Sequence, residues 1–299
     1  MKRVYVSGCF DDLRSGAVRF LEEASRLGPV TVFLRDDEAA ESLLGHPAKF
    51  SFSERRYFVE ALRWVDRVEP VGRDCNSDAL PESAMTSAGT AGADALWATL
   101  DPAVEGLPGS PPAERASPEK IEYCRARGGE YVVIGTAQLD GFRAFSPHDA
   151  SGTPNSASRV ASGNKKAIAT GSFDWLHTGH VRFFEEAAGW GELTVVVGHD
   201  ANIRLLKGEG HPLVAEAERR YMVASIRYVS QALVSTGSGW LDAEPEIDVV
   251  KPDRYIVNAD GDKDEKRRFC EAHGIEYVVL SRDPKPGLPR RSSTDLRGF

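Results

Sequence analysis

The sequence predicts an α/β protein in which two doubly wound parallel sheets, each flanked by helices on both faces, follow one another along the chain. The first observation is length: 299 residues are enough for two domains of ordinary size. The second is internal repetition, because four sequence blocks occur twice in the same order. The third is the alternation of short β-branched apolar runs with helical segments, which is typical of parallel sheets.

The repeat begins where Gly8 aligns with Gly171, and it continues through both halves of the chain. The paired blocks are 8–12 with 171–175, 20–28 with 183–191, 54–65 with 218–229, and 123–134 with 269–280. We therefore expect one domain at 1–145, a Ser/Gly/Asn/Pro-rich linker at 146–165, and a second domain at 166–299. An Ala/Gly/Ser/Pro-rich insert at about 74–118 is expected to be mostly loop.

Strands and helices alternate most clearly in the second repeat. The expected strands are 166–171, 193–198, 254–259 and 276–281, and the expected helices are 180–189, 215–229 and 262–274. Ligands in such sheets bind at the carboxyl ends of the strands. The turn that follows the first of these strands is therefore expected at the binding edge.

The composition and charge of the chain limit the classes of function that are expected. The net charge is −8 and the sequence pI is about 5.5, which argues against a nucleic-acid partner but allows a small anionic substrate in a locally basic pocket. Four scattered cysteines, Cys9, Cys75, Cys124 and Cys270, form no CxxC pair and are expected to be reduced thiols. No run is long enough for a signal peptide or a membrane span, so a cytoplasmic protein is expected.

The segment TGSFDWLHTGHVRFFEEA, 170–187, carries the strongest chemical signal. It joins a strand to a helix start, with Thr178 as the expected N-cap, and a helix N-terminus favours phosphate. Gly171 and Gly179 let the backbone approach a ligand closely. His177 and His180 are three residues apart and can both donate hydrogen bonds to a phosphoryl group.

Two further elements suit phosphate. Lys207 precedes a glycine-rich turn and can act as a point charge on a phosphate. The segment 290–294, with Arg291, Ser292, Ser293 and Thr294, places guanidinium and hydroxyl groups at an expected helix start. The first repeat has Arg14, Ala17 and Leu44 at the places of the histidines and the lysine, and it has no such terminal segment. We infer that the second repeat does the chemistry and the first supports it.

Simpler interpretations exist for each element. The two histidines could hold zinc, but no third ligand stands at a useful spacing. Segment 290–297 could be an ordinary helix start or a phosphorylation site. The arrangement of all the elements together favours phosphate chemistry, and we expect no metal ligated by the protein alone.

The second repeat resembles the cytidylyltransferase family of nucleotidyltransferases, whose signatures are a G-x-F-D-x-x-H-x-G-H turn and a late (R/I)-S-(S/T)-T run. The resemblance covers 166–299 and, more weakly, 2–141. It implies two Rossmann-like nucleotidyltransferase domains in tandem. It also implies transfer of a nucleoside monophosphate from CTP or ATP to a phosphorylated small molecule, with Mg²⁺ on the nucleotide and release of pyrophosphate.

By this resemblance, His177 and His180 contact the triphosphate and Lys207 bridges the two reacting phosphates. The implied nucleotide-binding residues are Gly171, Ser172, Phe173, Asp174, Gly179, Arg219, Arg291, Ser292, Ser293 and Thr294. Attack in line, without a covalent intermediate, would gain its rate from positioning and charge neutralisation.

The substrates stay open at this point. Segment 258–262, NADGD, stands where relatives read GDD or GGD, so the base is not fixed. LLKGEGHP, 205–212, resembles sugar-phosphate adenylyltransferases such as those that form ADP-sugars from heptose phosphates, whereas the tandem form resembles ethanolamine-phosphate cytidylyltransferase. Phosphoethanolamine-like alcohols, glycerol 3-phosphate and sugar 1-phosphates all fit as acceptors. Two alternatives are a nucleotide-binding regulator without turnover and, for assembly, an intramolecular pseudo-dimer or a homodimer.

Overall fold

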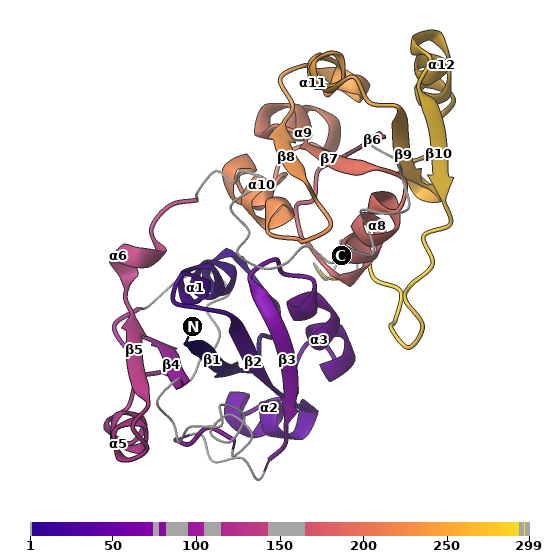
Figure 1. Ribbon diagram of the computed structural model, residues 1–299. Coiled ribbons are helices and arrows are strands. Elements are labelled where there is room, and N and C mark those ends of the chain that lie inside the picture. The colour runs from indigo at the N-terminus through magenta and orange to yellow at the C-terminus, as the bar shows by residue number, and fades with distance from the viewer. Residues whose placement is uncertain are drawn as a thin grey trace. The chain divides into compact units, whose positions relative to one another are not determined.

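The structure, a computed structural model, describes residues 2–73, 78–81, 95–104, 115–142, 165–292 and residue 296. The chain divides into two compact units, Met1–Gly141 and Phe142–Phe299. Both are drawn in Figure 1, and each is α/β with helices flanking a parallel sheet. The predicted fold class is confirmed. Residues 146–164 of the predicted linker lie outside the described residues.

The first unit contains a five-stranded parallel sheet in the order β3-β2-β1-β4-β5. Its strands are β1 (Arg3–Gly8), β2 (Val30–Arg35), β3 (Val65–Val71), β4 (Ala95–Leu100) and β5 (Glu130–Ile134). Its described helices are α1 (Ser15–Ser25), α2 (Asp37–Leu44), α3 (Phe52–Glu60), α5 (Pro118–Ala126) and α6 (Thr136–Leu139).

One inner strand of this sheet lies inside the segment that we expected to be mostly loop. Strand β4 pairs with β1 on one side and β5 on the other, and all six of its residues are buried. Its apolar run, ALWATL, is short, and the surrounding Ala/Gly/Ser-rich sequence hides it. Burial in the sheet, rather than local composition, determines the strand.

The second unit repeats the same topology, with the order β8-β7-β6-β9-β10. Its strands are β6 (Lys166–Gly171), β7 (Glu192–Val197), β8 (Gln231–Val234), β9 (Arg254–Asn258) and β10 (Glu276–Leu280). Its described helices are α8 (Thr178–Ala188), α9 (Asp200–Lys207), α10 (Glu216–Ala224), α11 (Glu244–Val250) and α12 (Asp264–His273), with short 3₁₀ turns η1 (Gly239–Leu241) and η2 (Ala259–Gly261).

The chain reverses its direction of growth across the second sheet next to β6. It runs from β6 to β7 and β8 on one side, and then returns to place β9 and β10 on the other. Ligands of doubly wound sheets bind outside the carboxyl ends of the strands at such a switch point. The turn after β6 therefore lies at the edge where a ligand is expected.

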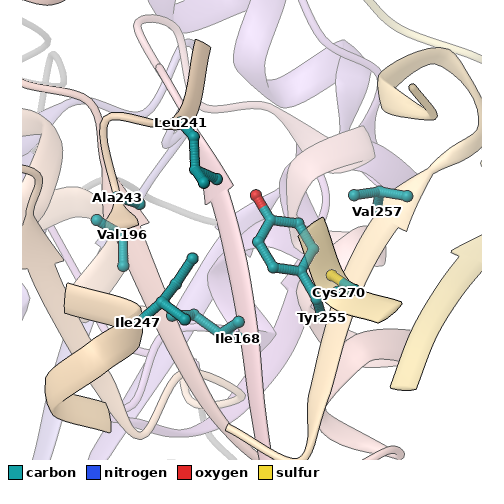
Figure 2. Close-up of a cluster of buried hydrophobic side chains, with 8 residues drawn as sticks. All are labelled: Ile168, Val196, Leu241, Ala243, Ile247, Tyr255, Val257 and Cys270. Atoms are coloured by element: carbon teal, nitrogen blue, oxygen red, sulfur yellow. The ribbon is translucent and has the colours of Figure 1, made fainter. Parts of the chain in front are cut away.

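Buried side chains hold the strands of the second sheet in place. Figure 2 shows one cluster of the second unit, in which Ile168 and Tyr255 from the sheet pack with Ile247 of α11 and Cys270 of α12. The Tyr255 hydroxyl lies 2.7 Å from the hydroxyl of Thr170, so this phenol is hydrogen-bonded although it is buried. This packing holds the central strands whose ends carry the site.

Candidate nucleotide site

The turn after β6 has a strained backbone. Phe173 adopts a φ of +48°, which is uncommon for a residue with a side chain. Its ring folds back over Gly171, where an added Cβ would lie 2.8 Å from the ring. Glycine at 171 is therefore required by the Phe173 ring, and the turn is held by packing within itself.

The two histidines lie against each other at the start of α8. Their ring centroids are 4.0 Å apart, with a tilt of 31° between the planes. His177, rather than the expected Thr178, is the N-cap: its Nδ1 accepts the N–H of Gly179 at 3.0 Å. Accepting at Nδ1 places the ring proton on Nε2 when the imidazole is neutral. A Cβ at Gly179 would lie 2.8 Å from the His177 ring, so a glycine is needed there too.

His180 is electrostatically the most perturbed group of the site. Burial, followed by the neighbouring charges of His177, Arg282 and Lys207, holds the pKa of His180 well below its ordinary value. Among the described residues its Nδ1 is buried and has no hydrogen-bond partner. The ring is therefore neutral near pH 7, and cations from two other segments face it.

Lys207 reaches this turn from a different helix. It is the last residue of α9, and its Nζ lies 2.7 Å from the Ser172 hydroxyl. At its other end α9 is capped by His199, whose Nδ1 accepts the N–H of Asn202 at 3.2 Å. The structure thus brings Lys207, Ser172 and the histidines together.

Asp174 and Arg219 are buried and hold loops. The Asp174 carboxylate accepts the N–H groups of Leu213 and Val214 at 2.8 and 3.0 Å. Arg219 is 1% exposed and donates to three carbonyls and to the carboxylate of Asp200. Neither side chain faces solvent at the mouth of the turn.

The segment after β10 runs beside the start of α8. A Cβ at Gly179 would lie 3.4 Å from the Arg291 carbonyl, and Leu296 donates its N–H to the Ser292 carbonyl at 3.2 Å. Ser293 and Thr294, which the sequence singled out, lie outside the described residues. The described part of the segment is therefore adjacent to the histidine turn.

A shallow hollow, open to solvent, lies between α8 and this segment. Its lining includes Gly179, Asn258, Arg282 and Arg291. Sequence reasoning missed Arg282, which forms an ion pair with Asp260 and has a φ of +61°. Its position two residues after the carboxyl end of strand β10 was the signal that could have found it.

Four exposed apolar side chains lie on α9, in the loop after it and on η1. Leu205, Leu206, Leu213 and Trp240 are 71, 57, 54 and 46% exposed. Trp240 belongs to η1, which is tied to α9 because the Asn202 amide exchanges two hydrogen bonds with the Gly239 backbone, at 3.1 and 2.8 Å. We refer to these four apolar residues as the apolar rim.

Within residues 2–73, 78–81, 95–104, 115–142, 165–292 and 296, no three His, Cys, Asp or Glu side chains gather in a way that could hold a metal ion. No helix in this part of the chain is long and apolar enough to cross a membrane.

Comparisons with known proteins find relatives of this chain. A family model described as cytidylyltransferase-like matches residues 168–298. An FAD synthase of Methanopyrus kandleri is 40% identical over 121 residues, which cover 38% of this chain and 77% of that protein. The bifunctional protein HldE of Citrifermentans bemidjiense is 42% identical over 136 residues, which cover 39% of this chain and 27% of HldE. A lipopolysaccharide core biosynthesis protein from Thermoplasma volcanium is 29% identical, over 40% of this chain and 98% of that one, with a TM-score of 0.35.

Proposed function

The chain belongs to the cytidylyltransferase-like family of nucleotidyltransferases, and from that membership we propose that its second unit transfers AMP from ATP to a phosphate group of a small molecule. One observation carries the proposal: the Lys207–Ser172 contact of 2.7 Å and the close histidine pair belong to the same turn, at the N-terminus of α8. A cation, two imidazoles and a helix N-terminus suit a transferring phosphoryl group.

In the proposed reaction, an oxygen of the acceptor phosphate attacks the α-phosphorus of ATP. The new P–O bond forms as the bond between the α-phosphorus and the bridging oxygen breaks, and pyrophosphate leaves with that oxygen. Lys207 neutralises charge between the two reacting phosphates. The work of the protein is positioning and electrostatic stabilisation, since no covalent intermediate is needed.

The histidines act on the triphosphate. His177 would donate from Nε2, because its Nδ1 already accepts the Gly179 N–H. His180 starts as a neutral ring because burial and nearby cations lower its pKa. A bound triphosphate adds negative charge beside those cations, so it favours the protonated ring at the moment when charge develops.

Magnesium fits this site as part of the nucleotide. Over the described residues no protein cluster could cage a metal, and Mg²⁺ commonly binds substrate phosphates while keeping several waters. The ion would neutralise triphosphate charge. Arg291, Ser292, Ser293 and Thr294 would hold the β- and γ-phosphates in this proposal, and the hollow beside Asn258 and Arg282 would receive the nucleoside.

The names of the relatives favour ATP over CTP. FAD contains AMP joined to the phosphate of riboflavin phosphate, so an FAD synthase that makes this bond transfers AMP to a phosphate. The alignment covers 77% of the Methanopyrus FAD synthase, so the likeness extends over most of that protein. Adenylyl transfer is therefore the finer activity that we propose.

The apolar rim favours a flat aromatic acceptor such as riboflavin phosphate. An exposed tryptophan suits stacking on a planar ring. The end of α9 joins this rim to Lys207, which would receive the acceptor's phosphate. The second candidate acceptor is a sugar phosphate, which the 42% identity to HldE and the segment LLKGEGHP support.

The test is pyrophosphate release by the full chain with Mg²⁺ and either ATP or CTP. Each nucleotide is offered with riboflavin phosphate, a heptose 1-phosphate, glycerol 3-phosphate or phosphoethanolamine. We expect release with ATP and one acceptor, and its loss in His177→Ala/His180→Ala. Release with CTP alone would contradict adenylyl transfer. Nucleotide binding without release for any pair would instead indicate a regulator.

A further inference from the structure

Arg219 is buried on α10, yet it reaches the turn that carries the histidines. Its Nε donates to the Val214 carbonyl at 2.7 Å and its Nη1 to the Ser172 carbonyl at 2.6 Å. Its Nη2 donates to the Gly198 carbonyl at 2.8 Å and to Asp200 at 2.6 Å. Four of the five N–H donors of the guanidinium are thereby used inside the protein.

These partners belong to three segments that carry the site. Ser172 lies in the turn between β6 and the histidines, and its side chain contacts Lys207. Asp200 is the first residue of α9, the helix that ends at Lys207. Val214 belongs to the loop that Asp174 also holds. A single side chain therefore links the histidine turn to the base of the helix that carries the lysine.

The first repeat contains the same set of contacts around Arg55. Its Nε donates to the Phe50 carbonyl at 3.0 Å, and its Nη1 donates to the carbonyls of Cys9 and Arg35 at 2.7 and 2.8 Å. Its Nη2 donates to Asp37 at 2.9 Å. In the alignment of the two repeats, these four partners are the counterparts of Val214, Ser172, Gly198 and Asp200.

The duplicated contacts distinguish a structural role of this arginine from a role in phosphate binding. The first repeat has lost both histidines and the lysine, but its arginine keeps every partner and is 2% exposed. An arginine that served a phosphate would have no reason to keep these contacts once the rest of the phosphate site was gone. The buried guanidinium is instead satisfied by the backbone around it.

We propose that Arg219 is a positioning residue that sets the distance between the histidine turn and Lys207, and that it does not bind the nucleotide phosphates. The assignment rests on the proposed transfer reaction for its catalytic consequence. It departs from the role that the family resemblance implies for this arginine.

The test compares matched variants of the full chain: Arg219→Lys with Arg55→Lys, and Asp200→Asn with Asp37→Asn. For each folded variant, the dissociation constant of MgATP, kcat and the KM of the acceptor are measured. We expect Arg219→Lys and Asp200→Asn to lower kcat about tenfold to 100-fold, as a misplacement of ~1 Å would, while the MgATP dissociation constant stays within about twofold. Both first-repeat variants should leave kcat unchanged.

A direct phosphate contact predicts the opposite pattern. Arg219→Lys would then weaken MgATP binding tenfold or more, and Asp200→Asn would leave binding and kcat intact or tighten binding, because it releases the guanidinium. Either result overturns the proposal. If Arg219→Lys does not fold, Asp200→Asn still distinguishes the two, because the side chain of Asp200 is one-third exposed and the substitution keeps its size.

The two proposals can fail separately. Wild-type turnover tests the transfer reaction, whereas the MgATP dissociation constants of the variants test the role of Arg219 and need no turnover. A wild-type chain that binds MgATP without releasing pyrophosphate would contradict the proposed function alone. In that case unchanged binding by Arg219→Lys supports the positioning role, and weakened binding overturns it.

Discussion

The turn after β1 and the turn after β6 share a backbone frame but differ in the side chains that line it. Phe10 and Phe173 both have a φ of +48° and both fold over a glycine, Gly8 or Gly171. Asp11, like Asp174, accepts two backbone N–H groups, from Lys49 and Phe50 at 2.7 and 2.9 Å. The strained phenylalanine and the aspartate are therefore features of the fold, because they persist where both histidines and the lysine are absent.

The side chains that differ are those that could meet a phosphate. Where the second unit has the cap His177, the first has Arg14, which lies 3.2 Å from Asp12. Asp12 also pairs with Lys49 at 3.3 Å, so a carboxylate neutralises both cations of that turn. The first repeat therefore serves as an internal control. Residues that both repeats share belong to the fold, whereas the residues that differ are the candidates for catalysis.

The largest effect should come from the histidines. Replacing both, His177→Ala/His180→Ala, should lower the rate of pyrophosphate release on the order of 10⁴-fold, since each donor to a developing charge contributes about 10² or more. The matched change in the first repeat, Arg14→Ala, should leave the rate unchanged. Equal losses from both would mean that the first unit also takes part in catalysis.

Lys207→Met should follow, with a rate about 10²-fold lower, because a charge between the two reacting phosphates is lost while most of the stem remains. In the first repeat the corresponding helix α2 ends at Leu44, and the nearby cation is Lys49. Lys49→Met should keep full activity. Steady-state kinetics of both variants would check this, and a wild-type rate for Lys207→Met would remove the lysine from the mechanism.

The shared aspartates should affect stability alike and activity differently. Asp174→Ala and Asp11→Ala each leave two backbone N–H groups without a charged acceptor, so each should lower the free energy of unfolding of its own unit by about 2 kcal/mol. Denaturant titration measures this loss. Turnover should fall about tenfold only in Asp174→Ala, because the loop that it holds lies beside the site. A loss of activity from Asp11→Ala, in folded protein, would contradict the division between the units.

His180 should make the second unit sensitive to acid. Its pKa is lowered in the folded state by burial and neighbouring cations, so below its ordinary value of 6.5 the unfolded chain binds the proton more readily. The free energy of unfolding should therefore fall by about 1.4 kcal/mol for each pH unit below 6.5 and stay level above it. Comparing the free energy of unfolding of the wild type with that of His180→Asn at pH 5.5 and 7.5 isolates this effect. The first repeat has Ala17 at the corresponding position, so it has no equivalent histidine. An identical pH dependence in the two proteins would contradict it.

The smallest effect concerns the acceptor. Trp240→Ala should raise the KM of an aromatic acceptor about fivefold and leave the MgATP dissociation constant unchanged, because one stacking face is lost. Folding should be unaffected, since nearly half of the side chain is exposed. An unchanged KM for riboflavin phosphate, with turnover of a sugar phosphate, would favour the second candidate acceptor.

The repeat and the residues that line its turn could be predicted from sequence because they are local. The alternation of strand and helix predicted the strands β6, β7, β9 and β10, and Gly171, His177 and Lys207 stood out by residue type and spacing. Four features could not be predicted this way. Strand β4 was hidden in a low-complexity context, and helix α10 ends at Ala224 instead of 229. The cap at His177 depends on a side-chain rotamer, and Arg282 approaches His180 only through the fold.

Helix α9 acts as a lever. It has eight residues, so at ~1.5 Å per residue Lys207 stands about 10 Å from the base of the helix at Asp200. A tilt of about 6° at that base moves the ammonium group by ~1 Å, a displacement that can cost ~10² in rate. The contacts at Asp200 therefore control a charge a whole helix length away. Small disturbances there, from a mutation or from a bound partner, are amplified before they reach the reacting phosphates.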